Sequence, residues 1–176
     1  MAVIGIDPGT ALTGYGIVEE LGDGSLRAID YGVFRTNANE APEIRLRSLF
    51  EQLNSLLLLH SLECAAVEKL FFQRNVKTAL SVGQARGVIM LSLTLANKQI
   101  FEYNPMDIKQ SVVGYGRADK KQVQQMVKVL LGLDSIPEPD DAADALAVAI
   151  CHIHSHKLLN TINPDENNNQ SIEPND

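Results

Sequence analysis

The sequence predicts an α/β domain whose mixed five-stranded sheet is covered by helices on both faces. Three β-rich segments come first, at residues 2–6, 13–20 and 26–36, and the turn-forming Leu-Gly-Asp-Gly-Ser joins the last two as a hairpin. Helical and strand patterns then alternate along the chain, an order typical of parallel strands joined by covering helices. A three-strand meander followed by parallel strands is therefore expected.

The later segments are assigned from the spacing of their apolar residues. Recurrence every three or four positions predicts helices at 42–62, 75–97, 107–114, 120–131 and about 140–156. Two short apolar runs between these helices, CAAVE and IFEY, predict the fourth and fifth strands. The first and fourth strands can then be parallel neighbours in the sheet.

The composition indicates one domain and a tail. A chain of 176 residues with 45% apolar side chains can bury one core, which is assigned to residues 1–156. Residues 157–176 are polar and acidic, and are expected to be disordered. No run of about 18 apolar residues predicts a membrane span, and the amino terminus has no signal-peptide pattern. Cys64 and Cys151 lie in apolar surroundings, as in the core of a reduced cytoplasmic protein.

The distribution of charge favours a polyanionic partner although the net charge is −7. Between Lys69 and Lys128 there are ten Lys and Arg residues against three acidic ones, whereas acidic residues dominate both flanking regions. This middle third is the candidate surface for nucleic acid. The alternative is a chance clustering of basic residues on solvated helix faces.

Acidic residues stand where strands end and where the last helix begins. Asp7 ends the first strand and Glu68 ends the fourth, so parallel pairing would bring both to one edge of the sheet. Asp141 and Asp144 share a helix face, while Asp140 points roughly 100° away from Asp141. Asp140 and Asp141 could instead cap the helix. Asp144 lies in a helix of Ala, Leu, Val and Ile, where an unpaired charge would be costly.

Several carboxylates at one place repel each other unless a cation lies among them. Carboxylate oxygens suit hard divalent ions such as Mg²⁺. Two such ions about 3.5–4 Å apart can activate a water molecule and stabilise the leaving oxygen in phosphodiester cleavage. The acidic residues therefore fit a divalent-cation site better than four separate accidents.

The chain resembles the RuvC family of bacterial Holliday-junction resolvases over roughly residues 2–156. The segments that carry the resemblance are IGIDPGTALTGYG, AAVEKLFF, VKTAL, SVGQARG and DDAADALAVAICH. The resemblance implies a ribonuclease H-like fold, a homodimer, and symmetric nicking of two opposing strands of a four-way DNA junction in recombination and repair. It also suggests contact with the RuvA–RuvB branch-migration complex.

By the same resemblance, the catalytic and metal-binding residues are Asp7, Glu68, Asp141 and Asp144. The doubled aspartate leaves open whether Asp140 contributes, but the i, i+3 spacing and the intervening Ala-Ala favour Asp141 and Asp144. These residues are expected to hold Mg²⁺, as two ions per subunit, for which Mn²⁺ could substitute.

An aromatic and basic segment follows Glu68. Phe71 and Phe72 stand close to Arg74 and Lys77, and aromatic rings beside cations suit unpaired bases. The alternative is that both rings are core residues. The resemblance favours Phe71, and less firmly Phe72, as an aromatic residue that probes opened bases at the junction centre.

Further basic residues flank the segment GYGR, namely Lys109, Arg117, Lys120 and Lys121. They are interpreted as phosphate contacts, which position a protein on DNA without specifying sequence. Lys109 and Lys120 also match basic positions of the family. The alternative is a solvated helix face.

Gly83 and Gly87 form a small-xxx-small pair in the second helix, which allows another helix to approach closely. Tight packing on the sheet is one explanation. The resemblance implies the other, dimerisation along this helix, which would set two active sites against two strands.

Three other functions are weighed. An actin-like ATPase also has Asp-x-Gly-Thr after a strand, but it needs a second lobe and a second glycine-rich loop, so no nucleotide cofactor is expected. A junction-binding protein without catalysis would be supported by the loss of one acidic residue, and all four are present. A related nuclease acting on RNA–DNA hybrids has similar acidic residues, but the segments LFF and GQARG favour the resolvase.

Overall fold

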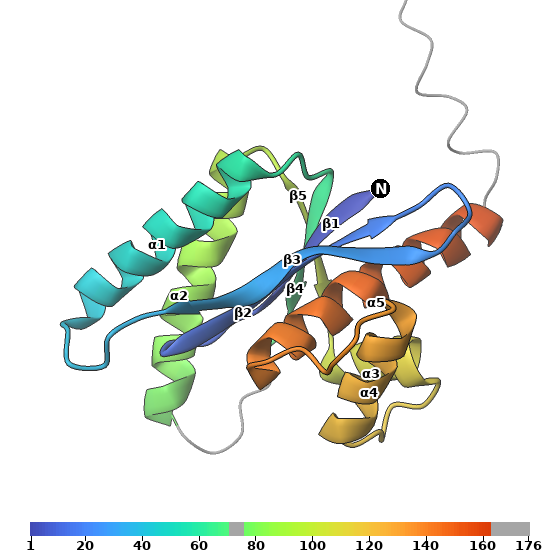
Figure 1. Ribbon diagram of the computed structural model, residues 1–176. Coiled ribbons are helices and arrows are strands. Elements are labelled where there is room, and N and C mark those ends of the chain that lie inside the picture. Colours follow the sequence, from blue (N-terminus) through green and yellow to red (C-terminus); the bar gives the residue numbers. More distant parts are fainter. Residues whose placement is uncertain (71–75, 163–176) are drawn as a thin grey trace, which may run out of the picture.

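The computed structural model describes residues 1–70 and 76–162, and for 76–78 and 159–162 it describes the backbone alone. The elements run in the order β1 (Ala2–Asp7), β2 (Leu12–Glu20), β3 (Leu26–Arg35), α1 (Pro42–Leu59), β4 (Cys64–Glu68), α2 (Val76–Leu95), β5 (Gln99–Tyr103), α3 (Pro105–Val113), α4 (Lys120–Leu130) and α5 (Asp140–Ile162). Figure 1 shows α1 and α2 on one side of the sheet and α3, α4 and α5 on the other.

The sheet has five strands in the order β3-β2-β1-β4-β5, in which the predicted meander and the predicted neighbours β1 and β4 are present. Strands β1, β2 and β3 form an antiparallel meander, whereas β4 is parallel to both β1 and β5. Ile6 of β1 lies opposite Val67 of β4, and the next residues along these strands are Asp7 and Glu68. The two carboxylates therefore leave the sheet side by side at its carboxyl edge.

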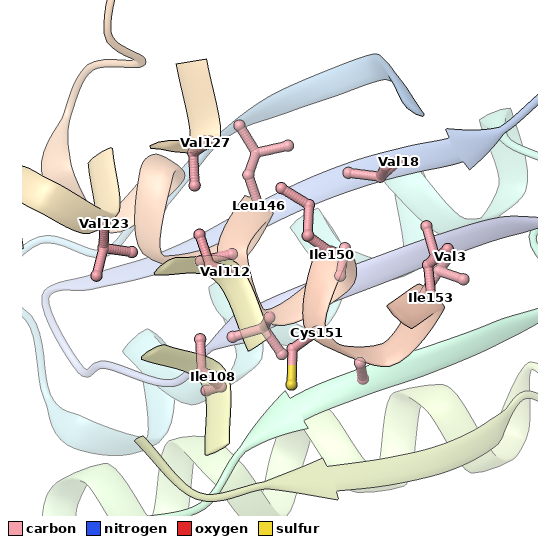
Figure 2. Close-up of a cluster of buried hydrophobic side chains, with 14 of the residues drawn as sticks. Val3, Val18, Ile108, Val112, Val123, Val127, Leu146, Ile150, Cys151 and Ile153 are labelled. Carbon is pink, nitrogen blue, oxygen red and sulfur yellow. The ribbon is translucent and has the colours of Figure 1, made fainter. Parts of the chain in front are cut away.

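Alternation along the strands divides the core into two layers. Ile4 and Ile6 of β1 pack with α1 and α2, whereas Val3 packs on the opposite face with α3, α4 and α5. Figure 2 shows the second layer, in which Leu146 and Ile150 of α5 lie between the sheet and the flanking helices. Because residues two apart in a strand share a face, Asp7 lies on the α5 face with Val3.

Helix α5 lies directly on β1 and β2 because these strands present glycine to it. A Cβ atom at Gly5 would overlap the backbone of Ala145 and Ala149, and one at Gly14 would overlap the carbonyl oxygen of Asp141. Alanines fill most of the facing side of α5, so the helix backbone approaches the strands closely. This contact fixes how far the first turns of α5 lie from the end of β1.

The predicted end of the last helix at His156 is wrong by six residues, because α5 continues to Ile162. Lys157 supports the extension: its Nζ atom lies 2.6 Å from Oε1 of Glu20 and 3.2 Å from the carbonyl oxygen of Gly24, in the β2–β3 hairpin. The tail predicted as disordered from residue 157 therefore begins as helix. Its remainder, 163–176, lies outside the described residues.

The two cysteines agree with the expectation from their apolar surroundings. Cys64 and Cys151 are buried and free, as predicted for small core residues. Across the described ranges, none of the helices combines the length and the apolar character that crossing a bilayer requires.

Candidate active site

Asp7 and Glu68 are brought together by the parallel pairing of β1 and β4. Both side chains are half-buried on the α5 face, and a hydrogen bond joins them. Two carboxyl groups can share such a bond only when one of them carries a proton. Burial is the main cause that raises the pKa of each, and the hydrogen bond raises the pKa of Asp7 further while it opposes the rise at Glu68. Burial and mutual repulsion therefore disfavour two negative charges on this pair.

Asp141 and Asp144 complete an acidic cluster with Asp7 and Glu68. The negative charges of Glu68, Asp144 and Asp141 each add to the rise in the pKa of Asp7 that burial causes. Burial also raises the pKa of Asp144. The four carboxylates predicted for the site thus lie close enough together, at the carboxyl edge of the sheet, for their charges to interact. Their combined charge is unfavourable unless protons or cations compensate it.

Two lysines border the acidic cluster. Lys109 of α3 and Lys120 of α4 line a cavity of about 190 Å³ together with Glu68 and Asp144. The other residues that line this cavity are apolar, namely Pro105, Ile108, Val123 and Ala147. Lys120 donates to Asp144 across 2.9 Å, and both lysines oppose the rise in the pKa of Glu68. Acidic and basic groups therefore meet in one cavity, where a phosphate could approach a cation.

The donor set fits a divalent cation. Four carboxylates supply hard oxygen ligands, which suit Mg²⁺ or Mn²⁺ better than a soft metal. Within the ranges that the structure describes, no three acidic, His or Cys side chains enclose a cation as they now lie. Asp144 is paired with Lys120 instead, and Asp7 interacts with Glu68.

The remaining basic residues of the prediction lie apart from the cluster. Lys121 borders a separate apolar depression with Val113 and Met126, so its side chain leaves α4 in another direction from that of Lys120. Arg117 is exposed between α3 and α4. Phe71, Phe72 and Arg74 lie outside the described residues, as does the side chain of Lys77.

Gly83 and Gly87 face open space on α2. In the part of the chain that the structure describes, a Cβ atom at either position would meet no atom within 4 Å beyond its own stretch of helix, so tight packing on the sheet does not explain them. Large exposed apolar side chains accompany them on the same helix, at Leu80, Leu91 and Leu95. The two glycines therefore belong to an uncovered apolar surface of α2.

Two sets of contacts near the site were not predicted from the sequence, although Asp140 itself was considered for the metal site. Asp140 and Gln124 are partners of each other, and Asp140 also pairs with Lys120. Arg45 of α1 donates from Nη2 to the carbonyl oxygen of Thr10 across 2.7 Å, holding the turn that follows Asp7. Arg45 was not singled out in the sequence, because the spacing of apolar residues in this helix does not indicate which polar side chains contact the loop after β1.

The strand order and the acidic cluster at the carboxyl edge define a nuclease of the ribonuclease H-like class. The family model of the crossover junction endodeoxyribonuclease RuvC matches residues 3–152. The chain belongs to this family.

Relatives of high identity agree with this assignment. Crossover junction endodeoxyribonuclease RuvC of Caldicellulosiruptor saccharolyticus is 53% identical over 155 residues, covering 88% of this chain and 93% of the relative. The corresponding protein of Heliobacterium modesticaldum is 55% identical over 155 residues, covering 88% and 95%.

Solved structures show the same fold. That of Thermus thermophilus RuvC superposes with a TM-score of 0.84 at 34% identity and covers 90% of this chain and 96% of its own. A second structure of that protein, in complex with Holliday junction substrate, gives a TM-score of 0.82 at 32% identity with the same coverage. The predicted family and fold are confirmed.

Proposed function

We propose that the protein resolves four-way DNA junctions by metal-dependent nicking of two opposing strands. The observation that carries this proposal is the cluster of Asp7, Glu68, Asp141 and Asp144 beside two lysines, in a chain of the RuvC family. A related structure contains Holliday junction substrate, which supports the choice of substrate.

The four acidic residues would hold Mg²⁺, as two ions per subunit, with Mn²⁺ as a substitute. When bound, such ions supply an activated water nucleophile and neutralise the charge on the leaving oxygen. Asp7 ends β1 within the cluster and would hold the ions together with Glu68, Asp141 and Asp144. Lys109 and Lys120 would hold the phosphate beside the cluster.

Other DNA contacts are proposed farther from the cluster. Arg117 and Lys121 are exposed and would contact phosphates outside the cleavage site. For the remaining predicted contacts, Phe71, Phe72, Arg74 and Lys77, the support is the sequence and the family.

We infer that the protein works as a homodimer joined along α2. The support is an uncovered apolar surface that contains Gly83 and Gly87, where two helices could approach closely. Two identical sites related by a twofold axis would then match the symmetry of a four-way junction. Contact with the RuvA–RuvB branch-migration complex remains a proposal from the family. A cytoplasmic location is likewise proposed, in keeping with two buried free cysteines.

The test compares wild type, Asp7→Asn and Asp134→Asn on a synthetic four-way junction, with Mg²⁺ and with EDTA, resolving nicks on every strand. Wild type should give paired symmetric nicks with Mg²⁺ alone, and Asp7→Asn should bind the junction without cutting it. Asp134→Asn removes the same charge at an exposed position between α4 and α5 and should cut normally.

Two outcomes would overturn the proposal in different ways. Wild type that binds junctions but never nicks them would leave a binding protein without catalysis. Equal cutting of duplex DNA, RNA–DNA hybrid and junction would keep the nuclease but remove its selectivity for junctions.

A further inference from the structure

Lys120 lies between two carboxylates of α5. Its Nζ atom is 3.3 Å from Oδ2 of Asp140 and 2.9 Å from Oδ2 of Asp144. The other oxygen of Asp140 accepts a hydrogen bond of 3.1 Å from Nε2 of Gln124, a buried residue one turn farther along α4. Side chains of α4 thus contact both carboxylate oxygens of Asp140: the ammonium group of Lys120 contacts one, and the amide group of Gln124 contacts the other.

The geometry of α5 separates Asp140 from the acidic cluster. At about 100° per residue, Asp144 projects roughly 40° from Asp140 and roughly 60° from Asp141, and it lies between them. Asp141 and Asp144 act on Asp7 electrostatically, whereas Asp140 faces α4 and is mostly exposed. Asp144 therefore belongs to the acidic cluster and also forms an ion pair with Lys120.

We propose that Asp140 is a positioning residue which, with Gln124, holds the ammonium group of Lys120 at the rim of the acidic cluster. This inference rests on the proposed function. Asp144 must give an oxygen to a divalent cation, and an ammonium group paired to Asp144 alone would compete with that cation. A second carboxylate, anchored by Gln124, keeps Lys120 beside the phosphate while Asp144 is released.

A purely structural role for Asp140 has different consequences. As an acidic residue in the first turn of α5, it also interacts favourably with the helix dipole. That interaction would affect the free energy of unfolding, but it would not act through Lys120. The two roles can be separated by asking whether the effect of losing Asp140 depends on the presence of Lys120.

The experiment is a double-mutant cycle of Asp140→Asn and Lys120→Met, with Glu138→Gln as the matched control. Asparagine keeps an acceptor for Gln124 and removes only the charge. Glu138 is exposed beside Asp140 in the same surface depression, and in the described structure the carboxylates paired with Lys120 are those of Asp140 and Asp144. Its neutralisation therefore measures the general effect of one lost charge.

Two readouts are taken from each variant. For the first, Mg²⁺ is titrated into the protein without DNA, and the concentration that produces half of the maximal rise in unfolding temperature is recorded. The second consists of kcat and KM for junction cleavage. Asp140→Asn should raise the half-saturating Mg²⁺ concentration about fivefold more than Glu138→Gln does. It should lower kcat roughly tenfold, with KM close to that of the control. In the Lys120→Met background the two substitutions should have equal effects.

The contrary outcomes are distinct. If Asp140→Asn and Glu138→Gln have equal effects while Lys120 is present, the positioning role is overturned. It is also overturned if the only effect of Asp140→Asn is a lower unfolding temperature in EDTA. An undiminished effect in the Lys120→Met background would instead make Asp140 a direct ligand and also overturn it. If wild type fails to nick junctions, the proposed function fails, while the Mg²⁺ titration still decides the role of Asp140.

Discussion

Asp7 lies directly opposite Gly14 in the antiparallel register of β1 and β2. Gly14 is also a point where α5 touches the sheet, because a side chain there would overlap the carbonyl oxygen of Asp141. One position in β2 thus sets the distance between the acid that ends β1 and the acidic residues that begin α5. The glycine is part of the construction of the site although it has no chemistry of its own.

We expect Gly14→Ala to move the first turn of α5 away from Asp7. The added methyl group meets backbone, which cannot rotate aside, so overpacking should lower the free energy of unfolding by about 1–3 kcal/mol. Misplaced carboxylates should lower kcat more than tenfold. This loss corresponds to an activation barrier that is higher by roughly 1.4 kcal/mol or more. Nicking kinetics and denaturant unfolding measure the two effects.

Gly22→Ala is the control for this change. Gly22 lies in the β2–β3 hairpin, and a Cβ atom there would meet nothing within 4 Å. Its stability should stay within about 0.5 kcal/mol of wild type, with normal nicking. Equal losses in the two variants would show that Gly14 has no special part in placing α5.

The sequence could predict Asp7 and Glu68 as neighbours because strand pairing and alternation are local and periodic rules. The approach of Asp141 and Asp144 to Asp7 was implied by the family resemblance, because strand rules do not say where α5 packs. The sequence could not predict that Lys120 bridges Asp140 and Asp144, since this depends on how α4 packs against α5. The end of α5 was missed because polar residues interrupt the apolar pattern after Ile153, while contacts with the β2–β3 hairpin support the helix.

Lys109→Met and Lys121→Met should have different effects although each removes one positive charge. Lys109 lines the cavity that contains Glu68 and Asp144, whereas Lys121 borders another depression. We expect Lys109→Met to lower kcat by about tenfold to a hundredfold, because a phosphate beside the cluster loses its cation. Lys121→Met should mainly reduce the salt dependence of junction binding. Single-turnover cleavage and binding at several salt concentrations measure the two effects, and identical losses of kcat would contradict the distinction.

Leu91→Glu should convert a dimer into a monomer. Leu91 is 54% exposed and shares α2 with Gly83 and Gly87, so a charge there would be buried in the proposed interface without a partner. Sedimentation should show the loss of the dimer, and the paired nicks in one junction should become independent single nicks. Leu58→Glu is the control, because Leu58 is 88% exposed at the end of α1 and its change should leave the oligomer intact. A monomeric wild type would refute the interface outright.

His152 should make the protein less stable in acid. Its ring is buried, with Nδ1 2.8 Å from the hydroxyl oxygen of Tyr103 and Nε2 3.2 Å from Sγ of Cys64. Burial, and secondarily the charge on His156, lower the pKa of His152 to about 4. The folded state therefore resists a proton that the unfolded chain accepts below about pH 6.5.

A depressed histidine pKa gives stability that is fully present above pH 6.5 and is lost as the pH falls toward 4. The loss should reach about 3 kcal/mol at pH 4, since one pKa unit corresponds to about 1.4 kcal/mol. His152→Gln keeps a polar side chain that does not titrate, so its free energy of unfolding should fall less steeply between pH 6.5 and 4. Urea unfolding of both proteins across this range makes the comparison. Parallel curves for the two proteins would mean that His152 accepts its proton equally well in the folded state, and that burial does not keep it neutral.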